Sequence, residues 1–122
     1  MTRNPAGSRH CLFTLAGLLA DLDRRPSVRK DQVRSGDVVL VRTRNSVYAL
    51  RAEGGGEYRV SGGWFDRPGN AVGRVRVSGC TWGGSVIHAG LIAACGLRME
   101  FGNRVVTSTV MAVAHLPAAL LN

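Results

Sequence analysis

The sequence predicts a mainly β fold: a small closed or partly open antiparallel β-barrel of about seven short strands, with a short N-terminal helix. The length of 122 residues suits a single domain. Sixteen glycines are more than a helical bundle tolerates, because an interior glycine costs about 0.5–1 kcal/mol relative to alanine. Short β-branched runs with period-two alternation recur between turn signals, a pattern typical of a barrel or sandwich.

A basic arm is expected over residues 1–36, with an amphipathic helix at about residues 12–23. Pro26 should end this helix, because proline disfavours helical geometry in the residue before it. The helix would pack on the domain or on a second subunit, and binding to a membrane surface is the alternative. Its apolar positions recur at helical spacing on one face: Leu12, Leu15, Ala16, Leu19 and Leu22.

The apolar run at residues 12–20 is too short to be a transmembrane segment, which needs about 20 residues. Arg3 and Arg9 precede it, as in an export signal, but no A-x-A cleavage site follows. We therefore expect no transmembrane segment, and an export signal is the less favoured reading of this run.

The barrel is expected over residues 37–116, followed by a tail at residues 117–122. Gly102-Asn103 is a two-residue connection suited to a tight hairpin. Residues 85–95 fit either a strand or a helical turn, and the sequence leaves both open. The expected strands are residues 38–44, 47–51, 58–61, 72–78, 97–101, 104–108 and 110–115.

The charge of the chain is strongly positive. Sixteen basic residues stand against eight acidic ones, which gives a net charge of +8. Half of this surplus lies in the 36 residues of the arm, as expected if the arm embraces a polyanion. A positive potential of this size attracts nucleic acid, an anionic membrane or an acidic partner, although charge also serves solubility alone.

Two pairs of arginines are candidate phosphate ligands. Arg42 with Arg44, and Arg74 with Arg76, are spaced at i and i+2, so each pair lies on one face of its strand. If the two strands are neighbours, the four guanidinium groups form a patch that can grip phosphate oxygens bidentately. An ordinary solvated face, neutralised by nearby glutamates, is the alternative.

Two tryptophans are candidate stacking platforms for unpaired bases. Trp64 and Trp82 each lie beside a pair of glycines, in loops that can hold a ring exposed. Stacking on a base is worth about 1–3 kcal/mol. The alternative is that these rings fill the ends of a small barrel, where a short chain needs large side chains.

The cysteines predict neither a disulfide framework nor a clear metal site. Cys11, Cys80 and Cys95 are odd in number and form no CxxC pair, which favours a reducing compartment such as the cytoplasm. Cys80, His88 and Cys95 provide only three of the four ligands that structural zinc requires. Cys80 beside His88 would act as a nucleophile only within hydrogen-bond reach.

Together these features favour a binding domain over an enzyme. We assign no catalytic residue, no metal and no cofactor, and we expect binding of nucleic acid or another polyanion through Arg42, Arg44, Arg74 and Arg76 with Trp64 and Trp82. A small thiol enzyme is a third, less favoured class. The main alternative is a module for protein–protein interaction or self-assembly, with a homo-oligomer formed through Leu12, Leu15, Leu19 and Leu22.

Overall fold

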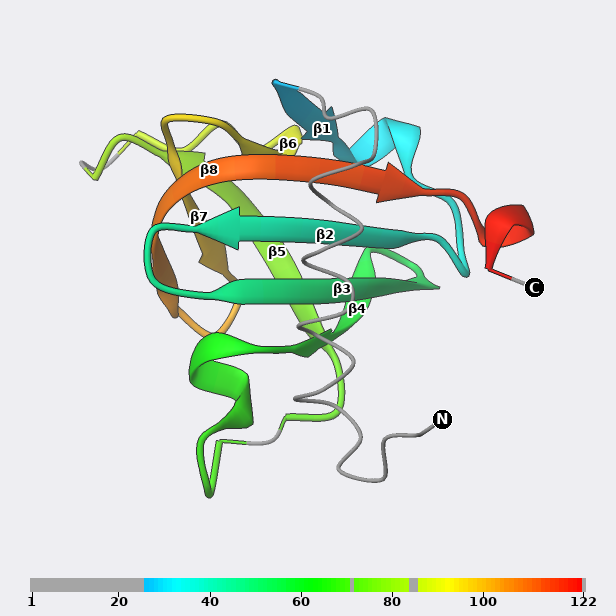
Figure 1. Ribbon diagram of the computed structural model, residues 1–122, viewed down its shortest axis with the longest axis horizontal. Coiled ribbons are helices and arrows are strands. Elements are labelled where there is room, and N and C mark those ends of the chain that lie inside the picture. Colours follow the sequence, from blue (N-terminus) through cyan, green and yellow to red (C-terminus); the bar gives the residue numbers. More distant parts are fainter. Residues whose placement is uncertain (1–25, 71, 84–85, 122) are drawn as a thin grey trace, which may run out of the picture.

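A closed six-stranded antiparallel barrel forms the body of the protein, as the sequence predicts (Figure 1). The computed structural model describes residues 26–70, 72–83 and 86–121, so the helix expected at residues 12–23 lies outside the described residues. Around the barrel the order is β2-β3-β4-β5-β7-β8, and β8 closes it by pairing with β2. The barrel strands are β2 (Val38–Thr43), β3 (Val47–Gly54), β4 (Glu57–Ser61), β5 (Val75–Thr81), β7 (Arg98–Phe101) and β8 (Val106–Leu116).

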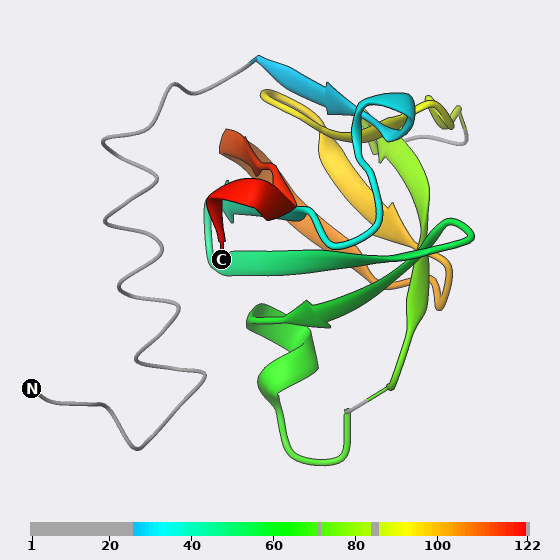
Figure 2. The same ribbon diagram turned by 90° about the vertical axis from the view of Figure 1, so that its right-hand side faces the viewer.

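Two further strands form a small separate sheet. β1 (Ser27–Arg29) pairs antiparallel with β6 (Leu91–Ala94), and both lie at the upper rim of the barrel (Figure 2). Three short 3₁₀ helices complete the described chain: η1 (Lys30–Gln32), η2 (Gly63–Asp66) and η3 (Ala118–Leu120). None of these described helices has the length and apolarity needed to cross a membrane.

Alternation along the strands fills the barrel interior. On β5, Val75 and Val77 are buried while Arg74, just before the strand, and Arg76 are exposed, as the sequence pattern predicts. Phe65 of η2 closes one end of the core, with its ring centroid 4.8 Å from that of Phe101. The main core also contains Val39, Val41, Tyr48, Leu50, Tyr58, Met99, Val110 and Val113.

The hairpin between β7 and β8 is present, but its loop is longer than the predicted Gly102-Asn103 connection. The Phe101 N–H donates to Val105 O (2.9 Å), and the Arg104 N–H donates to Phe101 O (2.8 Å). Arg104 has a φ of 70°, the left-handed geometry of a three-residue hairpin loop. Arg104 therefore belongs to the loop and not to the strand.

The strands predicted at residues 104–108 and 110–115 are one strand, β8, of 11 residues. Its first half pairs with β7 and its second half with β2. A register shift opposite Arg42 and Thr43 marks an irregularity in the pairing with β2. Such irregularities bend a strand and increase its twist, which lets one strand serve two neighbours around a barrel.

The structure resolves the open choice at residues 85–95 in favour of a strand. Backbone groups of β6 pair with β1, a partner that lies in the segment assigned to the arm. His88 adds an isolated antiparallel bridge to Cys80. A helical turn would leave the β1 edge unpaired, so the tertiary pairing overrides the helical tendency of the alanines.

A buried carboxylate ties the ends of the barrel domain together. The Asp37 carboxylate accepts hydrogen bonds from the Arg34 N–H (2.9 Å) and the Ala118 N–H (2.8 Å). It also lies 2.7 Å from His115 Nε2, on β8. Burial acts to raise the pKa of Asp37, but these hydrogen bonds outweigh it and hold the pKa below its ordinary value.

Candidate nucleic-acid interface

One row of arginines crosses the outer face of β3, β4 and the start of β5. Arg51 pairs directly with Arg59 in the β3–β4 register. The β4–β5 register, Glu57 with Arg76 and Tyr58 with Val75, places Arg74 beside Arg59. These three side chains, Arg51, Arg59 and Arg74, are all exposed, and we call them the β4 row.

Two carboxylates already neutralise part of the β4 row. Glu53 lies 3.3 Å from Arg59 Nε and 3.8 Å from Arg74 Nε, and Glu57 lies 3.7 Å from Arg74. Among the described residues, Arg51 forms no ion pair, although it stands directly opposite another arginine. Like charges in directly opposed positions of a sheet are destabilising.

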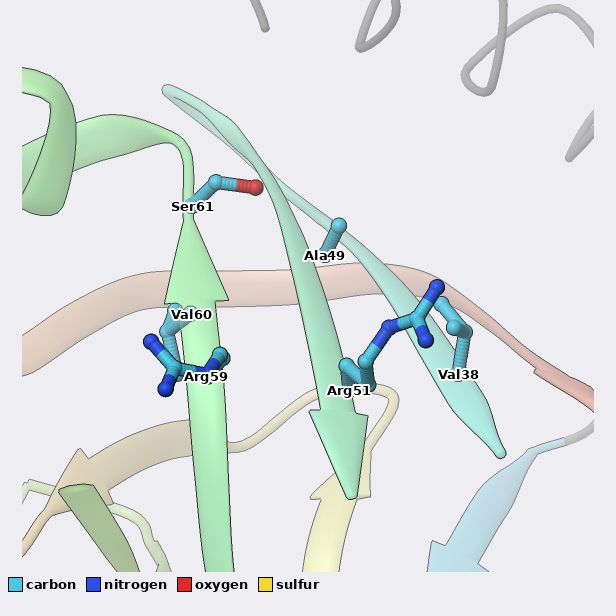
Figure 3. A pocket seen from close by; sticks show the side chains of 6 residues that line it. All are labelled: Val38, Ala49, Arg51, Arg59, Val60 and Ser61. Atoms are coloured by element: carbon cyan, nitrogen blue, oxygen red, sulfur yellow. The ribbon is translucent and has the colours of Figure 1, made fainter. Parts of the chain in front are cut away.

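A shallow groove of about 300 Å³ adjoins the β4 row (Figure 3). The Arg51 side chain reaches from β3 toward Val38 on β2, as Figure 3 shows. The groove thus combines apolar side chains with two guanidinium groups. Its lining residues are Val38, Ala49, Arg51, Arg59, Val60 and Ser61.

A second set of arginines lies on the outer face of β2, β8 and β7. The Arg44 N–H donates to Thr109 O (2.9 Å), and Thr109 is the register partner of Arg98 on its other side. Arg42 lies two residues before Arg44 on β2 and pairs with Ala112 of β8. We call Arg42, Arg44 and Arg98 the β8 set.

The β8 set differs from the β4 row in its charge balance. All three of its arginines are exposed, and within the described part of the chain none of them has a carboxylate oxygen within 4.0 Å. Strands lie about 4.8 Å apart, so the backbones of Arg44 and Arg98 are about 10 Å apart across β8. This surface carries concentrated positive charge without internal neutralisation.

Trp82 lies beside the β8 set. It directly follows Thr81, the last residue of β5, which is the register partner of Arg98. A turn holds it there, because the Gly83 N–H donates to Thr81 Oγ1 (3.0 Å). Trp82 is 76% exposed, so its ring is free to stack on a ligand.

Trp64 has a different environment from Trp82. Its ring is half-buried and contacts Phe65 edge-on at a centroid distance of 5.2 Å. It packs against the main core, in line with the alternative that a large ring fills one end of the barrel.

The structure separates the predicted arginine pairs. β2 and β5 are not neighbours, since two strands lie between them on either side of the barrel. The condition for a four-arginine patch is therefore not met. Arg42 and Arg44 join Trp82 and Arg98 on one surface, and Arg74 and Arg76 lie on another beside Glu57.

Sequence reasoning missed Arg51, Arg59 and Arg98 as candidate ligands. The pairing of Arg51 with Arg59 could have been found, because a hairpin folded symmetrically about Gly55 places the two residues opposite each other. The placement of Arg98 beside Arg44 could not, because it depends on β8 pairing with both β7 and β2.

The thiols give no support to nucleophilic chemistry. The Cys80 side chain is fully buried and donates to Ile92 O (3.4 Å). Burial raises the pKa of Cys80 to about 11, which disfavours the reactive thiolate near neutral pH. Across the described ranges, no three His, Cys, Asp or Glu side chains converge in a group that could hold a metal ion.

Comparison of the chain with protein-family models, with curated proteins and with solved structures gives no match.

Proposed function

We propose that the protein is a non-enzymatic binding domain for single-stranded nucleic acid, and that the β8 set holds the phosphates. The observation that carries this proposal is the concentration of three exposed arginines without ion pairs among the described residues, beside an exposed tryptophan. A reducing compartment such as the cytoplasm fits Cys80 and Cys95, both of which are free thiols.

The chemistry of arginine supports phosphate as the ligand group. A guanidinium remains charged at any physiological pH and presents a planar fork of donors that matches two phosphate oxygens. In the β4 row, Glu53 and Glu57 already occupy such donors. In the β8 set the donors remain available to a ligand, so we expect the phosphate backbone to follow this set.

Trp82 supports a single-stranded ligand over a duplex. Bases of a single strand can unstack and lie on an exposed ring, whereas bases in a duplex are held in their own stack. Trp82 is next to the register partner of Arg98, so a base and its phosphate can be held by adjacent side chains.

The experiment is fluorescence anisotropy of the full chain with a short random single-stranded RNA and a duplex DNA, at about 50 and 200 mM salt. We expect Arg44→Glu/Arg98→Glu to weaken RNA binding. We also expect the slope of log affinity against log salt to become shallower by about two, one for each lost phosphate contact.

A charge-matched variant separates a site from a general field effect. Arg59→Glu/Arg74→Glu changes the net charge by the same amount on the β4 row, and we expect a smaller loss of RNA affinity. Equal losses in the two double variants would contradict the assignment to the β8 set. Absence of RNA binding by the unmodified chain at 50 mM salt would contradict the proposed function as a whole.

A further inference from the structure

The barrel carries a second apolar cluster on its outside. Val39 and Val41 of β2 point into the main core, so Val38 and Leu40 point outward. Leu40 is nevertheless 0% exposed. The outer apolar cluster consists of Val38, Leu40, Ala112, Ala114 and Leu116, with Ala49 against it.

The strands of this cluster do not by themselves account for the burial of Leu40. All of its members come from β2, β3 and β8, which lie side by side in one layer. Ala112 and Ala114 flank Leu40 with a single methyl group each, which is too short to shield a leucine from above. An apolar sheet face is ordinarily covered by a second layer of structure, and this face calls for one.

The chain contains a segment of matching character and length. Residues 12–22 have apolar side chains at helical spacing along one face. Eleven helical residues extend about 16 Å, and the six residues of β2 extend about 20 Å. A helix of this length covers most of the outer apolar cluster.

Chain connectivity brings this segment to the cluster. Pro26 O accepts a hydrogen bond from the Cys95 N–H (2.8 Å), and Cys95 Sγ donates to Met111 O (3.6 Å). The described chain therefore begins beside Met111, next to Ala112 of the cluster. Leu22 is four residues before Pro26, so it lies within about 14 Å of it in any conformation.

We propose that residues 12–22 form an amphipathic helix that packs on the outer apolar cluster of the same chain, with Leu15 and Leu19 against Leu40 and its alanine neighbours. The short connection through residues 23–25 favours the same chain over a second copy, because such a tether gives an effective concentration of about millimolar. The helix then serves as the second layer of the barrel and not as an oligomer contact.

The first test is hydrogen exchange of the unmodified full chain. We expect amides in residues 12–22 to exchange at least about tenfold more slowly than an unstructured segment does. Leu15→Asp should remove this protection, because a buried carboxylate without a partner opposes docking. Free exchange of residues 12–22 in the unmodified chain would overturn the proposal.

The second test is disulfide trapping, which identifies the partner of the helix. Leu19→Cys is combined with Ala114→Cys in a Cys11→Ser/Cys95→Ser background, oxidised, and analysed without reductant. We expect a disulfide within one chain at monomer mass. Thr14→Cys with Ala114→Cys is the matched control, because Thr14 lies on the opposite helix face and should form at most about a tenth of the disulfide. Disulfide-linked dimers, or equal yields from the two pairs, would overturn the proposal.

Discussion

Arg104 carries the clearest local strain among the described residues, where it is the one non-glycine residue with a positive φ, at 70°. An L-residue in this region pays about 1–2 kcal/mol, a cost that glycine avoids. We expect Arg104→Gly to raise the free energy of unfolding by about 0.5–1 kcal/mol, measured by urea denaturation. The gain is smaller than the strain because glycine adds entropy to the unfolded chain.

Arg104→Ala is the matched control for this substitution. It removes the same charged side chain but keeps a Cβ in the left-handed position, so its stability should stay close to that of the unmodified protein. If Arg104→Gly proved no more stable than Arg104→Ala, the backbone geometry would not be the cause.

At the scale of single residues, alternation was the most informative part of the sequence. It correctly placed Val75 and Val77 inside the barrel and Arg76 outside, because a strand with one buried face needs a period of two. It did not identify the left-handed conformation of Arg104, because that position is usually glycine and the preceding Gly102-Asn103 gave a stronger turn signal.

The hairpin of β3 and β4 carries an electrostatic conflict in the Arg51–Arg59 pair. We expect Arg51→Glu to raise the free energy of unfolding by about 0.2–1 kcal/mol, because an opposite-charge pair replaces a like-charge pair. Thermal denaturation at low salt and at 1 M salt measures the effect, which should shrink at 1 M, where the screening length is about 3 Å.

Arg51→Gln is the control for the hairpin, since it removes the repulsion without adding an attraction. Its stability should lie between those of the unmodified protein and Arg51→Glu. A glutamate variant less stable than the glutamine variant would mean that Glu53 and Glu57, and not Arg59, dominate the field at this position.

At the scale of elements, predictions succeeded where local pairing decides the structure. The β3–β4 hairpin follows from two short runs around a glycine turn. β6 was left open because its pairing partner, β1, is far away in the sequence and its alanines also suit a helix. The positions of the β8 set likewise depend on long-range pairing, which no local pattern contains.

The whole domain should depend on pH through Asp37. Its pKa is lowered in the folded state, so its contribution to stability is fully present above about pH 4, the range of an unfolded aspartate. That contribution is lost as the pH falls from there through the lowered pKa. We expect Asp37→Asn to cost about 1–3 kcal/mol at pH 7, because one amide cannot accept from every donor around Asp37.

Urea denaturation of Asp37→Asn between pH 7 and pH 2 tests this expectation. The variant should lose less stability below pH 4 than the unmodified protein does. Asp31→Asn is the matched control, because Asp31 is exposed and paired only with Arg29, so its stability and pH profile should barely change. Parallel pH profiles of Asp37→Asn and the unmodified protein would show that other carboxylates govern the acid limit.

The closing contact of the barrel determines when the protein can fold. β2 is the first barrel strand in the chain and β8 is the last, and Val38 pairs with Leu116 at their junction. Contacts between such distant residues require closing a long loop, which slows folding. During synthesis, β2 therefore keeps one unpaired edge until Leu116 has left the ribosome. In that interval its run of Val38, Val39, Leu40 and Val41 is open to mispairing with other nascent chains.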